Sequence, residues 1–313
     1  MAFRFKIVPE QTNFDFQSRN KIAALFSALL ILSSIGVFLL QGLNLGIDFK
    51  GGILLETRTS QAEADIGALR SDLGALGLGE VSIQKFGTDK DVLIRVQRQE
   101  GDEKAQVAAL EKITSTLGSD FEVRRTEFVG PTVGAELREK GMLAVFCALL
   151  AIMIYIWFRF EWQFSVAAII ALTHDILSTI GLFALTSFEF NLATVAAILT
   201  IAGYSINDTV VVFDRVRENL RRYKSQDQKE ILNISLNETL SRTVMTSVTT
   251  ALALIAIIIF GGAVLRDFAI ALLWGVTIGT YSSIFVAVGF LSRFDLKAAA
   301  EEQEENGLTG NEQ

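Results

Sequence analysis

The sequence contains very little of the side-chain chemistry on which disulfide frameworks, metal sites and many hydrolases depend. It has one cysteine and one histidine among 313 residues, so no disulfide can form within the chain and no His/Cys metal cluster can be assembled. It also lacks HExxH and GxSxG motifs, which excludes two common kinds of active site. We therefore expect no enzyme, no metal and no bound cofactor. The single cysteine, Cys147, lies in an apolar run, and we expect a buried structural thiol.

Prolines are also scarce, with two in the chain, and half of the residues are hydrophobic. Apolar runs of about twenty residues recur, which soluble domains do not show. There are six, at 22–40, 142–158, 164–185, 192–213, 244–260 and 268–290. The first follows basic residues but lacks a small-x-small cleavage site, so we interpret it as an uncleaved anchor. The sequence therefore predicts a polytopic α-helical membrane protein with six spans.

Basic residues indicate which connections stay in the cytoplasm. The N-terminal arm (1–21) is basic, and so is segment 214–242, through Arg215, Arg217, Arg221, Arg222, Lys224, Lys229 and Arg242. An even number of spans separates them, so we predict that both termini are cytoplasmic. The acidic segment 294–313 is expected to be a disordered tail. The net charge of −7 does not indicate nucleic-acid binding.

A hydrophilic segment, 43–141, separates the first span (22–42) from the later ones (142–293) and should lie on the outer side. Its patterns alternate between strand and helix, with strands at 53–59, 80–86, 91–97 and 121–128 and helices at 61–77 and 103–118. This order is β-α-β-β-α-β, the arrangement of ferredoxin-like α+β domains. From turn chemistry alone, we interpret the glycine-flanked stretch 46–52 (GIDFKGG) as a turn between the membrane and the first strand.

The fourth run contains Asp208, a carboxylate that costs about 3 kcal/mol at the centre of a span. Such a residue should face protein or water and is a candidate for function. Thr200, Tyr204 and Asp208 recur every four residues, with Asn207 beside them. We therefore predict a polar stripe along one face of this helix.

The fifth run begins with its own polar stripe, formed by Arg242, Thr246, Thr249 and Thr250. Because the fourth helix runs inward and the fifth returns outward, Asp208 and Arg242 should lie at comparable depths, within reach of a long guanidinium. Arg242 alone could equally be a membrane-boundary anchor. The matched depth and aligned faces favour a pair that binds and releases a proton, because motion between the two charges changes the protonation of the carboxylate.

Two other spans carry polar or small residues. The third contains His174 and Asp175 near mid-membrane, followed by Ser178 and Thr179. This pair could take part in proton conduction or only pack, and both alternatives stay open. The sixth contains Trp274, Thr277 and Tyr281 on one face, and Gly275 and Gly279 at a spacing that favours close helix packing over ligand binding.

Five stretches of the chain resemble the SecF branch of the SecD/SecF family of bacterial protein-export membrane proteins, which is related to resistance-nodulation-division (RND) transporters. The longest are GYSINDTVVVFDRVRENL (203–220) and NETLSRTVMTSVTT (237–250); the others are LGIDFKGG (45–52), VGPTVGAEL (129–137) and ALTHD (171–175). The resemblance covers nearly the whole chain, including the order of one span, an outer domain and five spans.

The resemblance implies a partner, SecD, and cooperation with the SecYEG translocon and YajC. It implies a bacterial inner-membrane protein that uses the proton motive force to promote export of secretory polypeptides. Asp208 would be the proton-binding carboxylate and Arg242 its counterpart, with Asn207 and Tyr204 beside them; His174, Asp175 and Thr246 would be secondary. Gly46, Asp48, Phe49, Gly51 and Gly52 belong to a family hallmark without an assigned chemical role.

Two alternative functions remain. A small-molecule RND-type proton antiporter would be expected to have larger outer domains, usually in a longer chain. A non-energised scaffold or insertase helper would use Asp208 and Arg242 as a static packing pair.

Overall fold

Six long apolar helices dominate the computed structural model, which describes residues 12–79, 81–101 and 103–297. The helices long and apolar enough to cross a membrane are Gln17–Gln41, Val133–Arg159, Trp162–Thr186, Leu192–Arg222, Gln228–Phe260 and Leu265–Leu291. All six predicted spans are confirmed, and the chain is a polytopic helical membrane protein. The fourth and fifth helices are longer than their apolar runs and continue through the basic segment 214–242, with a break at 223–227.

Within these spans the elements are α1 (Asn20–Gln41), α5 (Pro131–Arg159), α6 (Trp162–Thr186), α7 (Leu192–Arg222), α8 (Gln228–Phe260), α9 (Gly262–Tyr281), the π-helical turn η3 (Ser282–Ala287) and α10 (Val288–Leu291). Capping side chains define two of the starts. Asn191 and Thr194 form a capping box at α7, and Asp227 accepts a hydrogen bond from the Lys229 amide at α8. These caps satisfy first-turn amides that have no partner within the helix.

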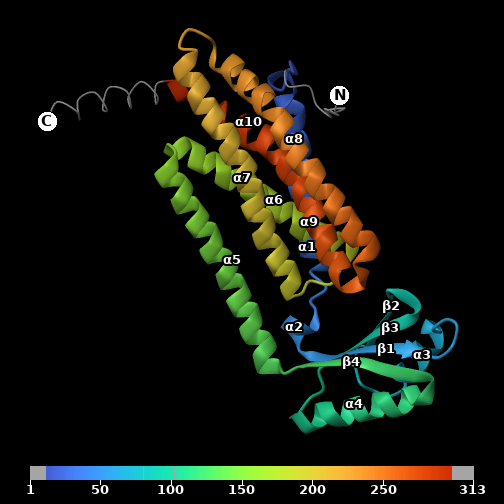
Figure 1. Cartoon of the computed structure of the whole chain (residues 1–313). Coiled ribbons are helices and arrows are strands. Elements are labelled where there is room, and N and C mark those ends of the chain that lie inside the picture. The colour runs from blue at the N-terminus through green and yellow to red at the C-terminus, as the bar shows by residue number, and fades with distance from the viewer. Residues whose placement is uncertain (1–11, 80, 102, 298–313) are drawn as a thin grey trace.

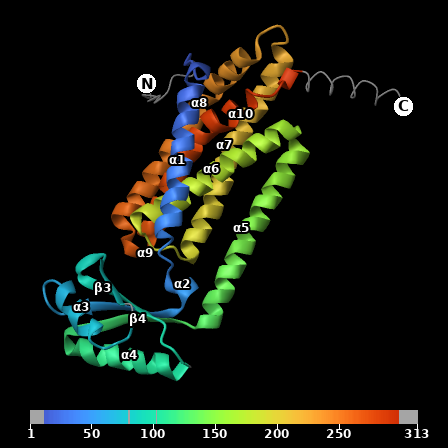
Figure 2. The same cartoon turned by 180° about the vertical axis from the view of Figure 1, so that it is seen from behind.

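The bundle has central and peripheral helices (Figures 1 and 2). In the most apolar stretch of α6, 56% of the residues are buried by the rest of the chain, whereas 6% are buried in the most apolar stretch of α5. The central helices are α6, α7 and α9, while α1, α5 and α8 present apolar side chains outward. Cys147 is one of these outward residues on α5 and is exposed. The expectation of a buried thiol is therefore wrong, because α5 packs against its neighbours over only a narrow strip.

A four-stranded antiparallel sheet lies beyond one end of the bundle (Figure 1). Its strands are β1 (Gly52–Thr59), β2 (Val81–Phe86), β3 (Thr88–Gln97) and β4 (Phe121–Val129), in the order β2-β3-β1-β4. Helices α3 (Ile66–Gly74) and α4 (Glu103–Leu117) connect them. The β-α-β-β-α-β element order agrees with the sequence prediction, although the first helix is shorter than 61–77 because Asp65 caps it.

Alternation along the strands gives this α+β domain two different faces. Ile53, Leu55 and Ile94 belong to a buried cluster shared with α3 and α4. Their neighbours Leu54, Glu56 and Arg95 line a cavity that also includes residues from the connection between α6 and α7 and from the adjacent ends of α7 and α9. The sheet therefore lies between its own helices and the bundle, as Figures 1 and 2 show.

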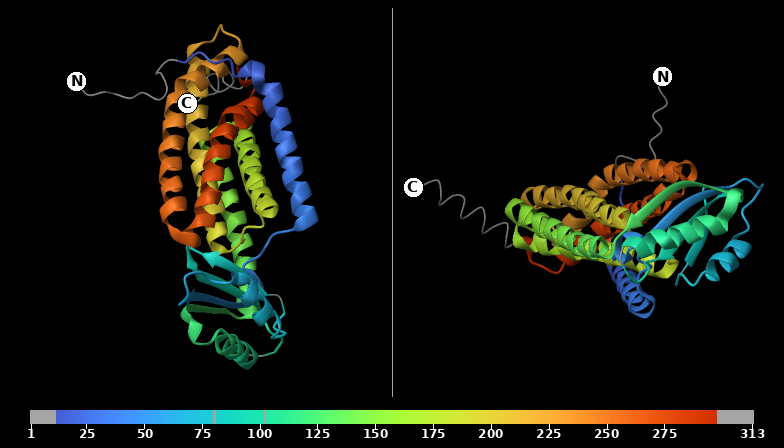
Figure 3. Two further views of the ribbon diagram at one scale, coloured as in Figure 1. Left: turned by 90° about the vertical axis from the view of Figure 1, so that its right-hand side faces the viewer. Right: turned by 90° about the horizontal axis from the view of Figure 1, so that it is seen from below.

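The first and last described segments and the 223–227 connection lie together at the opposite end of the bundle (Figure 3). The N-terminal segment is held there by α8: the Phe14 amide donates to Asn237 at 2.8 Å, and the Phe16 amide donates to Asn233 at 2.9 Å. The basic segments that the sequence assigns to one side of the membrane are thus adjacent. Residues 1–11 and 298–313, which include most of the predicted tail, lie outside the described residues.

Candidate intramembrane site

Asp208 is buried on the inner side of α7, with 3% of its surface exposed. Its Oδ2 atom has no hydrogen-bond partner among the described residues. The hydroxyl of Tyr204, one turn earlier, is also buried without a partner there. An unsatisfied carboxylate in a dry environment is costly, so Asp208 is an unusual feature that requires explanation.

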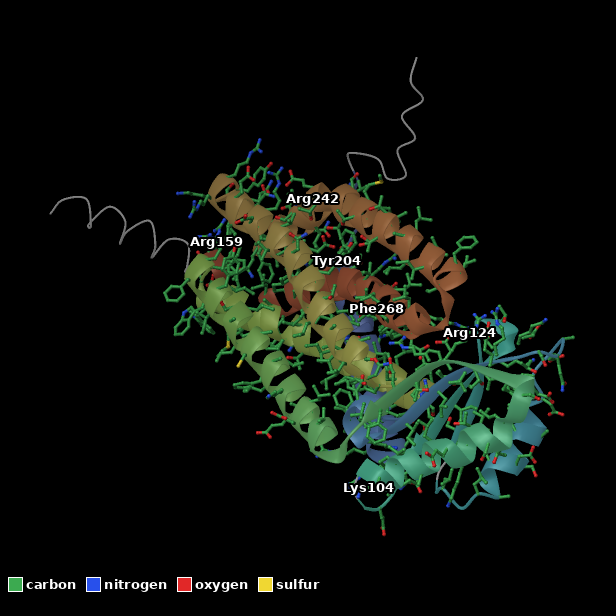
Figure 4. All side chains as sticks on the ribbon, turned by 60° about the horizontal axis from the view of Figure 1, so that its bottom comes forward. Lys104, Arg124, Arg159, Tyr204, Arg242 and Phe268 are labelled. Atoms are coloured by element: carbon green, nitrogen blue, oxygen red, sulfur yellow. The ribbon has the colours of Figure 1, made fainter. Side chains whose placement is uncertain are left out.

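The cationic counterpart comes from α8. The charge of Arg242 acts on the Asp208 carboxylate, and the Thr246 side chain lies close enough to interact with the same carboxyl group. No ion pair joins Arg242 to a carboxylate of the described residues, and its side chain is exposed. Figure 4 shows Arg242 on α8 toward the end of the bundle remote from the sheet, with Tyr204 deeper along α7. The two helices thus bring the predicted pair together without closing it into a salt bridge.

The predicted polar stripe of α7 is divided between two environments. Asp208 is buried and Tyr204 half-buried, whereas Thr200 and Asn207 are exposed. Because a spacing of four residues drifts by about 40° at each step along an α-helix, the four side chains spread over an arc that is buried at one edge and exposed at the other. On α8, the hydroxyls of Thr246 and Thr250 donate to carbonyls of the preceding turn.

Asp175 in α6 is the second buried carboxylate of the bundle, and its exposed fraction is 0%. Its Oδ2 accepts hydrogen bonds from Ser205 of α7 at 2.5 Å and from Ser282 of η3 at 2.8 Å. Its Oδ1 lies 3.0 Å from the Nδ1 atom of His174. The structure therefore brings His174 and Asp175 together in a network that joins three elements, although the Nε2 atom of His174 has no partner among the described residues.

The same seam is closely packed next to Asp208. Thr209 of α7 and Ser283 of η3 are hydrogen-bonded at 3.0 Å. A Cβ atom at Gly275 would lie 2.3 Å from Ile201, and one at Gly279 would lie 3.2 Å from Ser205. The prediction that these glycines permit close helix packing is confirmed.

Four hydroxyl residues in this seam escaped the sequence analysis: Ser205, Thr209, Ser282 and Ser283. In the sequence they look like the small residues that are common in apolar helices. The available signal was their spacing, since Ser205 lies three residues before Asp208 and shares its face of α7.

The family hallmark lies far from this site, at the junction of bundle and sheet. Residues Ile47–Lys50 form a single helical turn, α2, which Gly51 separates from β1. The stretch therefore connects the membrane to the first strand, as the turn interpretation predicts. Ile47 and Phe49 are buried, so the stretch also packs against its surroundings.

Two cavities of about 590 and 360 Å³ lie beside this junction and share the Arg95 and Glu189 side chains in their linings. These two residues form an ion pair between β3 and the α6–α7 connection. Burial raises the pKa of the Glu189 carboxyl above its usual value, and Arg95 acts in the opposite direction. Among the described residues, no group of three His, Cys, Asp or Glu side chains is arranged to hold a metal ion.

Comparison with known proteins gives consistent similarities. Residues 109–297 match the model of the protein export membrane protein SecD/SecF C-terminal region, and residues 36–63 match the SecD/SecF GG motif. The protein translocase subunit SecF of Rickettsia rickettsii is 45% identical over 296 residues, covering 93% of this chain and 95% of its own. The same subunit of Rhodobacter capsulatus is 46% identical over 302 residues, covering 92% and 90%.

Two solved structures are also similar. The crystal structure of SecDF from Thermus thermophilus, described as a translocon-associated membrane protein, has a TM-score of 0.81 at 36% identity. It covers 91% of this chain and 39% of its own. A SecDF structure in the super-membrane-facing form has a TM-score of 0.65 at 36% identity, with coverage of 95% and 40%. This chain thus spans about two fifths of the length of those solved chains.

Proposed function

Because the chain belongs to the SecD/SecF family of protein export membrane proteins, we propose that its membrane bundle couples a proton gradient to protein export. The chain is an accessory subunit of the Sec protein translocase. The observation that carries the energy-coupling proposal is Asp208, a buried carboxylate with an unpartnered oxygen, beside an arginine that is not bound to it.

The proton is the simplest partner for this carboxylate. A charged Asp208 in a dry site is costly, and either a bound proton or an approaching guanidinium reduces that cost. The bound proton and the ion pair are alternatives, because a carboxylate paired with Arg242 has less need of a proton. A movement of α8 against α7 therefore exchanges a proton for an ion pair. The membrane potential supplies about 2.3 kcal/mol per charge per 100 mV, which is enough to bias such a cycle.

We propose that SecD completes the site. Thr200, Asn207 and Arg242 are polar side chains on membrane helices that the rest of this chain leaves exposed. Exposure of such groups to lipid is unfavourable, so a second polytopic subunit with a polar face is expected to cover them. This role for SecD also agrees with the similarity to SecDF, of which this chain matches only a part.

The remaining assignments follow from this role. The subunit would lie in the bacterial inner membrane with both termini cytoplasmic, since the basic segments share one end of the bundle. The α+β domain at the other end would be periplasmic and ferredoxin-like, given its strand order. We propose SecYEG and YajC as further partners, a secretory polypeptide as the cargo, and no cofactor or catalytic residue beyond the proton-binding pair.

Translocation in inverted membrane vesicles tests the proposal. Completion of translocation of a secretory precursor is measured with and without a proton gradient, for wild type, Asp208→Asn and Asp214→Asn, with SecD association checked by pull-down. Asp214 is a matched control because it lies six residues along α7, where it pairs with Arg159 at the surface. We expect only Asp208→Asn to assemble normally yet lose gradient-dependent completion. A normal response would support the scaffold alternative.

A further inference from the structure

The glycine-flanked segment 44–52 is the part of the chain that the proton site leaves unexplained. It connects α1 to β1 and lies against the α6–α7 connection, residues 187–191, which is distant in sequence. The amide of Phe190 donates to the Asn44 carbonyl at 2.8 Å, and the amide of Gly46 donates to the Phe190 carbonyl at 2.9 Å. Leu45 and Phe190 thereby form a parallel bridge. The connection that leads into α7 is therefore hydrogen-bonded to the hallmark segment.

Asp48 extends this contact to α7 itself. Its Oδ2 accepts a hydrogen bond from the amide of Leu192, the first residue of α7, at 2.9 Å. Asn191 caps the third residue, Thr194, in the same turn. Two side chains thus satisfy two of the first-turn amides, and the Asp48 carboxylate also lies favourably at the positive end of the helix dipole. One of these caps comes from 144 residues away.

The other side of the segment is fixed to the sheet. Gly52 has a φ of +139°, and a Cβ there would lie 2.6 Å from the carbonyl oxygen of Val96 in β3. A Cβ at Gly46 would lie 2.4 Å from the Glu189 carboxylate, which pairs with Arg95 of the same strand. Gly52 therefore requires glycine, because the hallmark segment and β3 approach each other at backbone distance there, whereas Gly46 is crowded by the side chain of Glu189.

We propose that Asp48 is a positioning residue that ties the outer domain to the end of α7, the helix that carries Asp208. The inference rests on the proposed function, because α7 matters to export only if its Asp208 takes part in proton coupling. The Asp48 cap and the backbone bridge make the sheet and the start of α7 one mechanical unit. A shift of α7 during the proton cycle is then transmitted to the outer domain, where the cargo emerges. The role of Asp48 is hydrogen-bond acceptance and not proton transfer.

Amide hydrogen exchange tests the cap directly, in the full chain assembled with SecD. Asp48→Ala removes the acceptor, whereas Asp48→Asn keeps an oxygen of similar reach and is an equally good capping residue. We expect about fivefold faster exchange of the Leu192 amide in Asp48→Ala, since losing a cap costs about 1 kcal/mol. Asp48→Asn should exchange at nearly the wild-type rate. Asp72→Ala, at an exposed position of α3, is the control.

Leu192→Pro breaks the same bond from the other side. Proline lacks the amide but suits the first position of a helix, and the preceding Asn191 is already extended. Leu192→Ala controls for the lost side chain, which is 37% exposed. Because both changes remove one bond, we expect Asp48→Ala to have no further effect on export in the Leu192→Pro background. This second route stays informative if Asp48→Ala fails to accumulate.

Gradient-dependent export in vesicles is the second readout. We expect Asp48→Ala and Leu192→Pro to lower it about fivefold or more, with Asp48→Asn and Leu192→Ala near wild type. Loss of export in Asp48→Asn would overturn the proposal, because it would show that charge matters and not capping. Faster exchange with normal export would also overturn it. If wild-type export ignores the gradient, the proposed function fails, while the exchange data still decide whether Asp48 caps α7.

Discussion

The two buried carboxylates of the bundle, Asp208 and Asp175, have opposite surroundings. Asp175 accepts hydroxyl hydrogen bonds from two other elements and lies beside an imidazole. Asp208 has an oxygen without any partner among the described residues. Both are almost completely buried, so burial alone does not distinguish them. The difference agrees with the proposed proton cycle, which needs Asp208 free of fixed hydrogen-bond donors, whereas the hydrogen bonds of its neighbours hold Asp175 in place.

The geometry of α7 explains how the two sites coexist. Ser205 and Thr209 lie on either side of Asp208 in the sequence, and both bond to the seam with α6 and η3. That seam fixes the rotation of α7 and leaves Asp208 within reach of Arg242 and Thr246 of α8. A π-helical turn at this point is consistent with a functional role, since such turns are rare and recur at functional sites.

The largest expected effect concerns Arg242 of α8, the proposed charged counterpart of Asp208. Arg242→Gln should remove gradient-dependent export as completely as Asp208→Asn does, because either change leaves one state of the cycle without its partner. The double variant should be no worse than either single variant, since both act on one step. Arg242→Lys should keep part of the activity. Additive losses in the vesicle assay would contradict a shared step.

The next effect concerns stability on the α6 side. Asp175→Leu leaves the buried Ser205 hydroxyl and His174 without their acceptor, and leaves the Ser282 hydroxyl with the Gly279 carbonyl alone. It should lower the free energy of unfolding by about 3–5 kcal/mol. Asp208→Leu should cost far less, because no hydrogen bond to its Oδ2 is lost. Thermal unfolding of both variants in the same detergent measures the contrast. Equal losses would mean that the two carboxylates do not differ as described.

A smaller effect tests how tightly the seam is packed. Gly275→Ala places a methyl group against Ile201 and should cost about 1–3 kcal/mol by overpacking. The matched control is Gly203→Ala on the open side of α7, where nothing lies within 4 Å. That change should be neutral or stabilising in the isolated chain because alanine favours helix. The measurement is again thermal unfolding, and a tolerated Gly275→Ala would show a looser seam.

The smallest effect extends the comparison to a carboxylate outside the membrane. Asp91 accepts two hydrogen bonds from Arg58 and one from Thr88, and the Arg58 bonds, chiefly, lower its pKa from 3.8 to about 2. Because the folded-state pKa is depressed, its stabilisation is complete above about pH 4 and is lost as the pH falls toward 2. Its size should be about 1 kcal/mol, since Arg58 is partly solvated.

Amide exchange of β1 and β3, corrected for intrinsic rates, measures this contribution in wild type and Asp91→Asn. The two proteins should differ at pH 6 and converge near pH 2. A difference that persists at the lower pH would assign the effect to something other than ionisation.

Much of the fold could be predicted because its signals are local. Six apolar runs, the alternation in the outer segment and the two glycines of the sixth span all lead to observed features. The errors also have local causes. Cys147 was expected to be buried because its run is apolar, but a helix at the edge of a membrane bundle is apolar on its outer side as well.

The candidate site could be predicted only in part. The cost of a carboxylate in a span selects Asp208, and topology brings Arg242 to α8 beside it. The exposure of Asn207 and the partners of Asp175 could not be predicted, since they depend on how far each helix is rotated against its neighbours.

Sequence by itself therefore determined the number of spans, the order of strands and helices in the outer segment and the presence of costly charges in the membrane, because periodicity and hydropathy are properties of neighbouring residues. Only the tertiary structure decided which buried carboxylate is satisfied and that Asp48 caps a helix beginning at Leu192. These outcomes depend on contacts between segments far apart in the chain, and helix rotation and crossing set those contacts with no signature in any single segment.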